Sequence, residues 1–206
     1  MIAHPDDESF GLGAVIDEFG RGGTAVHVLC YTHGEASTLN ETGADLRQAR
    51  ERELRLAATE LGVATVTLLG YPDGGLATAQ SLTEPITRLA RQHRAGGLLV
   101  FDDTGITGHP DHRAATRAAV AAASLAGLPV LAWALSAEVA DRLRAETGQP
   151  FAGRPAAELD LSLRVSRDRQ RGAALRHASQ VSPDAVLWRR LALQGDQEHL
   201  RWLVRP

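Results

Sequence analysis

The stretch that decides the fold class is "GGLLVFDDTGITGHPDHRAATRAAVAAASLAG", residues 96–127. It opens with a short, nearly continuous apolar run over residues 96–103, which is typical of a parallel strand covered on both faces. A polar loop with glycines follows, and from residue 110 the pattern is helical up to Gly127, a common helix stop. The stretch therefore predicts one strand–loop–helix unit of an α/β fold.

The same order of strand and helix recurs along the chain. Further strands are predicted over residues 24–32, 64–71 and 129–135, and further helices over residues 44–62 and 81–97. This alternation favours a doubly wound, mostly parallel sheet with helices on both faces. Because neither a repeat nor an interdomain linker is visible, we expect a single domain over residues 1–206.

The ends of the chain are less regular. Residues 158–165 alternate between apolar and polar and predict an edge strand with one solvated face, whereas residues 167–178 and 183–204 look mostly helical. Residues 137–157 show little pattern and are interpreted as a connection or part of a lid. Only three residues precede His4, so we expect the first strand to be very short or incomplete.

Composition narrows the classes of function. The chain has 206 residues, of which 44% are hydrophobic, and a net charge of −3, which argues against a nucleic-acid or anionic-membrane surface. No apolar run approaches the length of a membrane helix, and no signal peptide is predicted. Cys30 is the only cysteine, so a thiolate metal cluster is excluded and a cytoplasmic location is expected. The absence of lysine removes Schiff-base chemistry.

Chemically active residues follow the short first strand and the strands predicted over residues 24–32, 64–71 and 96–103. The four turns are "HPDDE" (4–8), "HGEAS" (33–37), "PDGG" (72–75) and "DTGITGHPDH" (103–112). Ligands of open parallel sheets bind outside the carboxyl ends of the strands. The sequence therefore predicts a functional site built from these turns.

The two "HPD" segments indicate a metal centre. His4, Asp6 and Asp7 supply one imidazole and two carboxylates, and His109 and His112 supply two more imidazoles. Zinc binds histidine nitrogen and carboxylate oxygen, and a catalytic zinc keeps one position for water. Either segment alone would be weak, but two at the ends of different strands favour metal binding over a solvated polar cluster.

These motifs also carry a family resemblance. "AHPDDE" (3–8), "RERELRLAATELG" (50–62) and "GHPDH" (108–112) resemble the PIG-L/LmbE family of zinc-dependent N-deacetylases, with weaker support from "HASQ" (177–180). The resemblance covers roughly residues 3–120. It implies a Rossmann-like α/β fold and removal of an N-acetyl group from a sugar-like substrate such as an N-acetylglucosamine derivative.

The resemblance implies a role for individual residues. His4, Asp7 and His112 match the metal ligands. Asp6 matches the general base that takes a proton from the attacking water, and His109 matches the residue that stabilises the oxyanion or protonates the leaving amine. Zinc polarises a carbonyl and acidifies water, so an adjacent carboxylate and imidazole complete a hydrolytic site.

Other residues carry weaker expectations. Arg50 and Asp73 match substrate-binding positions, although an arginine-rich helix face is often only solvated and an aspartate before glycines often only makes a turn. Asp111 and Glu8 are expected to begin a helix or to orient a ligand histidine. His177 fits either the family feature or an ordinary buried histidine.

The predicted cofactor is Zn²⁺, with Fe²⁺ or another divalent metal left open because His/carboxylate sites accept both. The predicted partner is a small N-acyl sugar-like substrate, with no nucleic acid and no membrane span; a homo-oligomer is left open. Two other functions compete with the deacetylase. A metallophosphoesterase often uses two metals. A noncatalytic metal- or sugar-binding protein would need neither Asp6 nor His109.

Overall fold

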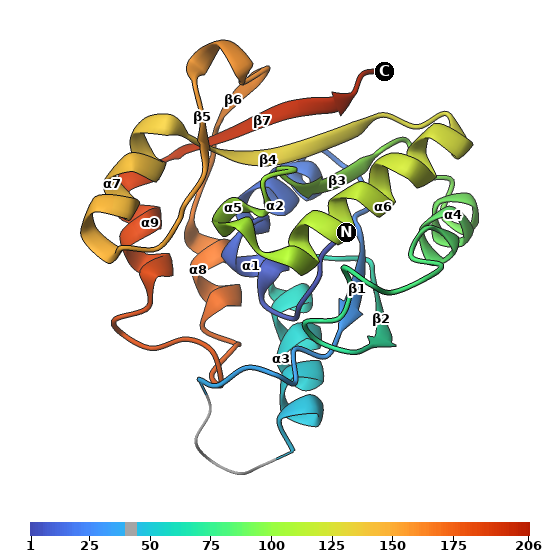
Figure 1. Ribbon diagram of the computed structural model, residues 1–206, viewed down its shortest axis with the longest axis horizontal. Coiled ribbons are helices and arrows are strands. Elements are labelled where there is room, and N and C mark those ends of the chain that lie inside the picture. The colour runs from blue at the N-terminus through green and yellow to red at the C-terminus, as the bar shows by residue number, and fades with distance from the viewer. Residues whose placement is uncertain (40–44) are drawn as a thin grey trace. The chain divides into compact units, whose positions relative to one another are not determined.

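A computed structural model describes residues 1–39 and 45–206 (Figure 1). These residues divide into two compact units. Unit 1 comprises Met1, Gly75–Arg164 and Arg189–Pro206, and unit 2 comprises Ile2–Gly74 and Val165–Trp188. The single domain expected from the sequence stays a prediction. Within the described residues, no helix has the length and apolar character needed to span a membrane.

Unit 2 is a two-stranded parallel sheet with four helices among its described residues. It contains α1 (Asp7–Phe10), α2 (Gly13–Arg21), β1 (His27–Thr32), α3 (Leu46–Glu60), β2 (Thr65–Tyr71) and α8 (Asp168–Ala174). Helices α1, α2 and α3 all pack against α8. The expected short first strand is a single parallel bridge between Ile2 and Cys30, so the chain turns away from the sheet directly after Ala3.

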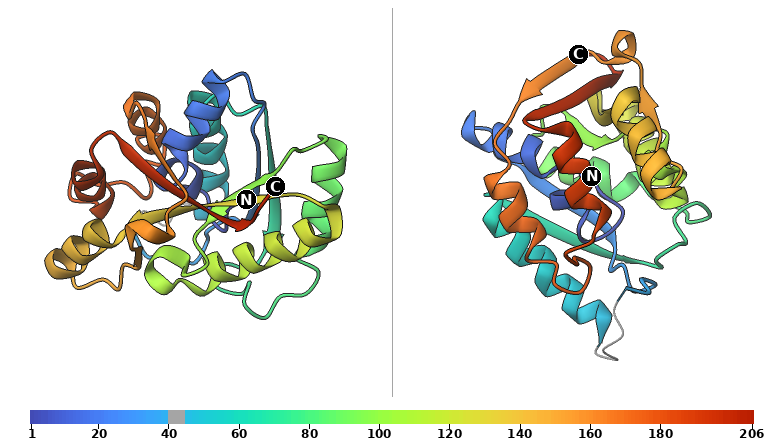
Figure 2. Two further views of the ribbon diagram at one scale, coloured as in Figure 1. Left: turned by 90° about the horizontal axis from the view of Figure 1, so that it is seen from above. Right: turned by 90° about the vertical axis from the view of Figure 1, so that its left-hand side faces the viewer.

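Unit 1 is built on a five-stranded sheet. It contains α4 (Thr83–Gln92), β3 (Leu98–Phe101), α5 (Gly105–Gly108), α6 (Pro110–Ala126), β4 (Val130–Ser136), α7 (Ala137–Thr147), β5 (Gly153–Arg154), a 3₁₀ turn (Ala156–Glu158), β6 (Leu161–Arg164), most of α9 (Val186–Gln194) and β7 (Gln197–Val204). The strand order is β3-β4-β7-β6, and β5 also pairs with β4. Helices α7 and α9 lie side by side, joined by an ion pair between Arg189 and Glu146 (Figure 2).

The predicted α/β class is confirmed. The pairs β1–β2, β3–β4 and β4–β5 are parallel, whereas β4–β7 and β6–β7 are antiparallel. The strands predicted over 24–32, 64–71, 96–103 and 129–135 correspond to β1 to β4, and the helices over 44–62, 81–97 and 110–127 correspond to α3, α4 and α6. Residue 44 of the first predicted helix lies outside the described residues. The predicted edge strand is β6, at the end of the strand order.

The prediction of a mostly helical segment over residues 183–204 is wrong for its second half. Helix α9 ends before Gly195, which has a φ of +57°, and the chain continues as β7. In "QEHLRWLV" the strand propensity is mixed, since Trp202 and Val204 favour a strand and Glu198 does not. Strand β7 pairs with both β4 and β6 and buries Glu198 and Leu200 on one face. Pairing in the sheet therefore overrides the local pattern.

The prediction of an irregular connection over residues 137–157 is also wrong, because α7 occupies its first half. The Ser136 side chain accepts a hydrogen bond from the Val139 backbone N–H, which caps the start of α7. Gly148, with a φ of +70°, caps the end of α7 in the left-handed region. Both capping signals are present in the sequence, and so is the helical spacing of four positions between the buried residues Val139 and Leu143.

Candidate active site

The turn over residues 4–8 of unit 2 holds a histidine and a carboxylate side by side. The backbone N–H groups of Ala3 and His4 both donate to Asp7 Oδ2, at 3.1 and 2.9 Å, so the turn fixes its own carboxylate. His4 Nδ1 lies 3.7 Å from the same oxygen, and both side chains are buried. Two ligands of one tetrahedral zinc stand roughly 3.3–3.6 Å apart at ordinary bond lengths, so this donor pair fits a shared ion.

Asp6 lies beside Asp7 in a different environment. Its backbone has a φ of 120°, which a residue with a side chain seldom adopts, and its side chain is 17% exposed. Asp6 Oδ2 accepts a hydrogen bond from Arg50 at 2.8 Å. Burial raises the pKa of Asp6 to about 6, against the lowering effect of the Arg50 guanidinium. Two adjacent carboxylates are thus held by different partners, Asp7 by the backbone and Asp6 by an arginine.

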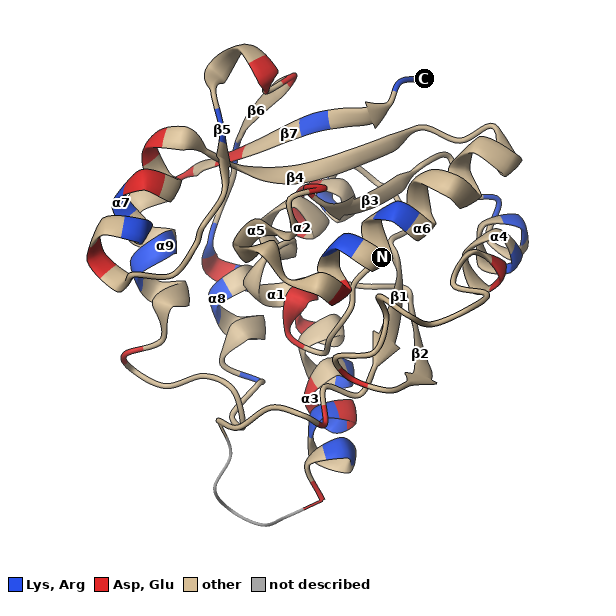
Figure 3. Cartoon of the chain, in the orientation of Figure 1, with Lys and Arg blue, Asp and Glu red and all other residues tan. Residues whose placement is uncertain are grey.

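Arg50 extends from α3, along which acidic and basic residues both occur (Figure 3). Unlike a solvated surface arginine, it is only 3% exposed. Its guanidinium donates to the carbonyl oxygen of Gly34 at 2.6 Å and to that of Pro5, in addition to Asp6. The structure therefore shows Arg50 in contact with the turn that carries Asp6. Substrate binding by Arg50 stays a prediction.

Asp73, which follows β2, contacts His4. Its Oδ1 lies 3.1 Å from His4 Nε2, and its Oδ2 accepts the backbone N–H of Ala36 at 2.9 Å. Burial alone would raise the pKa of Asp73, but the hydrogen bond and charge of His4 outweigh it and lower the pKa to about 2. A carboxylate on the second ring nitrogen is how proteins orient metal-binding histidines. Contact of Asp73 with a substrate remains a prediction.

Glu8 and His177 form a pair that the sequence analysis did not connect. Both side chains are fully buried, and Glu8 Oε1 lies 2.6 Å from His177 Nε2. Burial by itself lowers the pKa of His177, but the charge of Glu8 and its hydrogen bond outweigh it, and the net shift is upward. The available signals were the position of Glu8 inside "HPDDE" and the family-like "HASQ" segment.

In unit 1, Asp102 anchors the loop that leads to the second histidine motif. Asp102 Oδ1 accepts hydrogen bonds from Thr104 N–H and Oγ1–H at 3.0 and 2.7 Å. Arg154 and Arg201 also donate to this buried carboxylate. Burial would raise the pKa of Asp102, but the hydrogen bonds from Arg154, Thr104 and Arg201 lower it to about 2. The start of the loop is therefore held at the end of β3.

The hydrogen bonds of His109 and His112 assign the tautomer of each ring. His109 caps the start of α6 and its Nδ1 accepts the Asp111 backbone N–H at 3.2 Å, so the hydrogen of the neutral ring is on Nε2. His112 Nδ1 lies 3.2 Å from the carbonyl oxygen of Gly105, which can only accept, so the His112 lone pair is on Nε2. The two ring centroids lie 4.8 Å apart, and Nε2 of His109 carries a hydrogen whereas Nε2 of His112 carries a lone pair. Asp111 lies in the first turn of α6, as expected.

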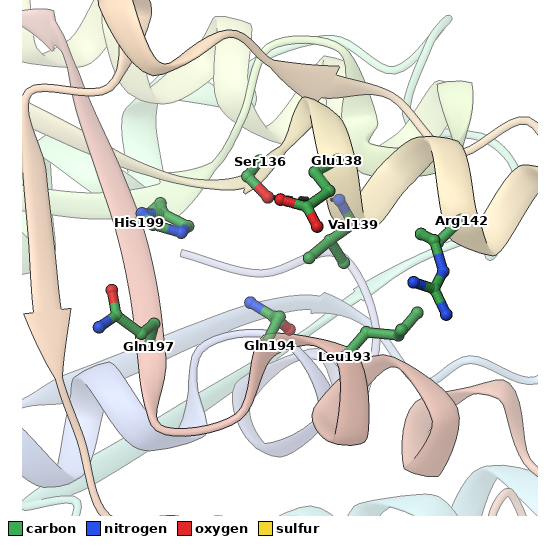
Figure 4. A pocket seen from close by; sticks show the side chains of 8 residues that line it. All are labelled: Ser136, Glu138, Val139, Arg142, Leu193, Gln194, Gln197 and His199. Atoms are coloured by element: carbon green, nitrogen blue, oxygen red, sulfur yellow. Dashed lines mark hydrogen bonds between the residues drawn. The ribbon is translucent and has the colours of Figure 1, made fainter.

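A pocket of about 220 Å³ lies elsewhere in unit 1 (Figure 4). It is lined by Ser136, Glu138, Val139, Arg142, Leu193, Gln194, Gln197 and His199. None of these described residues belongs to the predicted site.

The predicted site residues fall into one group in each unit. Unit 2 brings together His4, Asp6, Asp7, Arg50 and Asp73, and unit 1 brings together His109 and His112. Each group therefore holds imidazole nitrogens in positions set by hydrogen bonds, and the unit 2 group also holds carboxylates.

Comparison with known proteins identifies the family. Residues 1–123 match the family model described as PIG-L, GlcNAc-PI de-N-acetylase. The chain belongs to the PIG-L family. The resemblance carried by the "HPDDE" and "HPDH" segments is thereby confirmed.

Individual relatives agree with this placement in the PIG-L family. A probable N-acetylglucosaminyl-phosphatidylinositol de-N-acetylase of Schizosaccharomyces pombe is 33% identical over 54% of this chain and 46% of its own length. A diacetylchitobiose deacetylase of Thermococcus kodakarensis is 34% identical over 61% of this chain and 48% of its own length. The chain thus spans about half the length of these curated relatives. The crystal structure of a conserved protein from Thermus thermophilus is 26% identical, with a TM-score of 0.71 over 100% of this chain and 92% of that protein.

Proposed function

We propose that this protein is a metal-dependent hydrolase that removes an acetyl or other acyl group from the amide nitrogen of a sugar-like substrate. The observation that carries the proposal is the unequal treatment of two adjacent carboxylates. Asp7 is locked by backbone N–H groups beside His4, as suits a ligand, whereas Asp6 is turned toward Arg50 and stays partly exposed. Neighbouring carboxylates in different environments are the usual arrangement when each has its own role.

The metal set that the family resemblance implies is His4, Asp7 and His112. Two observations support it: His4 and Asp7 present donor atoms 3.7 Å apart, and the bond between His112 Nδ1 and Gly105 leaves Nε2 as the ligand atom. A bound Zn²⁺ or similar divalent ion would supply polarisation of the amide carbonyl and a more acidic water.

The remaining roles belong to the side chains of the chain itself. Asp6 removes a proton from the attacking water, and Arg50 keeps its carboxylate aligned. The Nε2–H of His109 donates to the developing oxyanion. This role is supported by the hydrogen bond from the Asp111 N–H to Nδ1, because that bond places the hydrogen of the neutral ring on Nε2. The oxygen of the water bonds to the acyl carbon, the proton that Asp6 took from the water passes to the amide nitrogen, and cleavage of the C–N bond releases the free amine and the carboxylic acid.

An N-acetylated amino sugar is the substrate class that we propose. The two curated relatives are named as a de-N-acetylase of N-acetylglucosaminyl-phosphatidylinositol and a deacetylase of diacetylchitobiose. Asp73 and Arg50 are proposed to contribute to substrate binding, in addition to their contacts with His4 and Asp6.

The test is amine release from a panel of N-acetyl sugars, including N-acetylglucosamine and diacetylchitobiose, by the zinc-loaded protein. Wild type should release free amine and acetate. Asp6→Asn keeps the shape of the side chain but loses the basic oxygen, so kcat should fall by roughly 10²–10⁴ with zinc still bound. A near-normal kcat in this variant would show that Asp6 is not the general base.

Two outcomes would replace the proposal by its alternatives. Hydrolysis of phosphate esters instead of amides, with two metals per chain, would identify a metallophosphoesterase. Stoichiometric binding of metal and sugar without turnover of any substrate would identify a binding protein.

A further inference from the structure

The backbone of Asp6 is strained and therefore needs support. A non-glycine residue at a φ of 120° is strained and persists only where the surroundings impose this conformation. Support comes from both peptide groups of the turn. The Asp6 carbonyl oxygen accepts the N–H groups of Ser9 and Phe10, and the Asp6 N–H donates to Glu8 Oε2 at 3.0 Å.

The hydrogen bonds to the Asp6 carbonyl oxygen are those of an ordinary helical turn, whereas the bond from the Asp6 N–H needs the Glu8 side chain. Its buried carboxylate collects three donors: the Asp6 N–H on Oε2, and the Ser9 hydroxyl and His177 Nε2 on Oε1. His177 Nε2 lies 2.6 Å from Oε1, and we assign the ring hydrogen to this nitrogen, because His177 Nδ1 has no hydrogen-bond partner among the described residues. The Glu8 carboxylate is thus oriented from one side by His177 and holds the Asp6 backbone on the other.

His177 is itself fixed by the segment that carries it, residues 177–180 after α8. Its carbonyl oxygen accepts the N–H groups of Gln180 and Val181. In the same segment, Ser179 donates to Glu53 of α3, the helix that also carries Arg50. The "HASQ" segment therefore joins the support of Asp6 to the helix that contacts the Asp6 carboxylate.

We propose that Glu8 and His177 are positioning residues that hold the Asp6 carboxylate in the orientation needed to take a proton from water. Glu8 acts on the Asp6 backbone, and His177 acts through Glu8. The inference rests on the proposed function, since it assumes that Asp6 is the base. It assigns the "HASQ" histidine a part in turnover without contact with the substrate.

The test compares His177→Phe with His177→Gln in the zinc-loaded protein. Phe keeps a ring in this site, where Phe10 packs edge-on, but has no donor; Gln restores an N–H near the position of Nε2. His177 Nδ1 has no hydrogen-bond partner among the described residues, so Phe removes the bond to Glu8 and the electrostatic effect of the imidazole on Asp6, and Gln restores the bond alone. His177→Phe should lower kcat roughly 10- to 100-fold with unchanged KM and zinc content, and His177→Gln should recover most of that loss.

A double variant separates positioning from a general structural role. In an Asp6→Asn background there is no base to position, so adding His177→Phe should lower the remaining kcat less than about twofold. An equal loss in both backgrounds would overturn the proposal, as would a His177→Phe protein with normal kcat. If His177→Phe does not fold, Glu8→Gln takes its place in the same comparison.

A second readout does not depend on activity. The hydrogen-exchange rate of the Asp6 amide, followed by NMR in the metal-free protein, should rise in His177→Phe. The Tyr31 amide, which bonds to Ile2 in the sheet of unit 2, should keep its rate. An unchanged exchange rate of the Asp6 amide in His177→Phe would show that Glu8 and His177 do not hold the Asp6 backbone. Absence of deacetylase activity in wild type would instead contradict the proposed function. Glu8 and His177 would then have no role in turnover, whatever the exchange rates show.

Discussion

At the scale of single residues, Arg50 shows how one side chain sets the environment of Asp6, the proposed base. Its guanidinium contacts the carbonyl oxygens of Pro5 and Gly34 and the Asp6 carboxylate. Gly34 makes this approach possible, because it has a φ of +65° and a Cβ there would collide with the guanidinium. We predict that Gly34→Ala displaces Arg50 and lowers kcat at least tenfold, measured with the best substrate of the panel.

Gly23→Ala is the matched control for this prediction. Gly23 also has a positive φ, +81°, but nothing lies within 4 Å of a Cβ built there. Both variants should lose about 1 kcal/mol of stability from backbone strain, and only Gly34→Ala should lose turnover. Equal kcat values in the two variants would show that the position of Arg50 does not matter for the chemistry.

At the scale of elements, Asp102 ties the end of β3 to β5 and β7. Its carboxylate accepts from Arg154, next to β4 in the sheet, and from Arg201 of β7. The pKa of Asp102 is about 2 in the folded protein, below its ordinary value of 3.8. The stabilisation is thus fully present above about pH 4 and is lost as the pH falls toward 2, since the unfolded chain takes up the proton first.

We predict that Asp102→Asn removes about 2 kcal/mol of stability at pH 7, from 1.36 kcal/mol per unit of pKa shift. Urea unfolding of the metal-free protein at several pH values between 7 and 2 measures it. The gap between wild type and Asp102→Asn should close as the pH falls from about 4 to 2. Asp103→Asn is the control, because Asp103 shares both arginines but is exposed, and its effect should be small. A constant gap across this pH range would contradict the prediction.

At the scale of the whole molecule, metal binding should stabilise the fold. A ligand that binds only the folded chain adds roughly 2.7 kcal/mol at a hundred times its Kd. For a chain of 206 residues, Tm should therefore rise by several degrees with Zn²⁺. We predict that His112→Ala abolishes this rise and the stoichiometric zinc measured by elemental analysis, whereas His93→Ala, at the end of α4, keeps both. Full zinc in His112→Ala would remove His112 from the ligand set.

The sequence by itself determined those features that short windows encode. Strand β1 and helix α6 follow from apolar runs, helical periodicity, a proline at the helix start and Gly127 at its end. The adjacency of His4, Asp6 and Asp7 and the spacing of His109 and His112 placed the chain in the PIG-L family before any contact was known. Such signals are local, because turn chemistry and periodicity act over a few residues.

Only the tertiary structure decided which distant residues meet. Gln197–Val204 is a strand because β4 and β6 supply hydrogen-bond partners on both sides, which decides the conformation of a segment whose own strand propensity is mixed. Arg50 is buried because three acceptors surround its guanidinium. Glu8 and His177 pair across 169 positions of the chain. Burying a charged side chain costs free energy unless a hydrogen-bond or ion-pair partner compensates it. Those partners come from elements far apart in the sequence, so only the packing of these elements determines them.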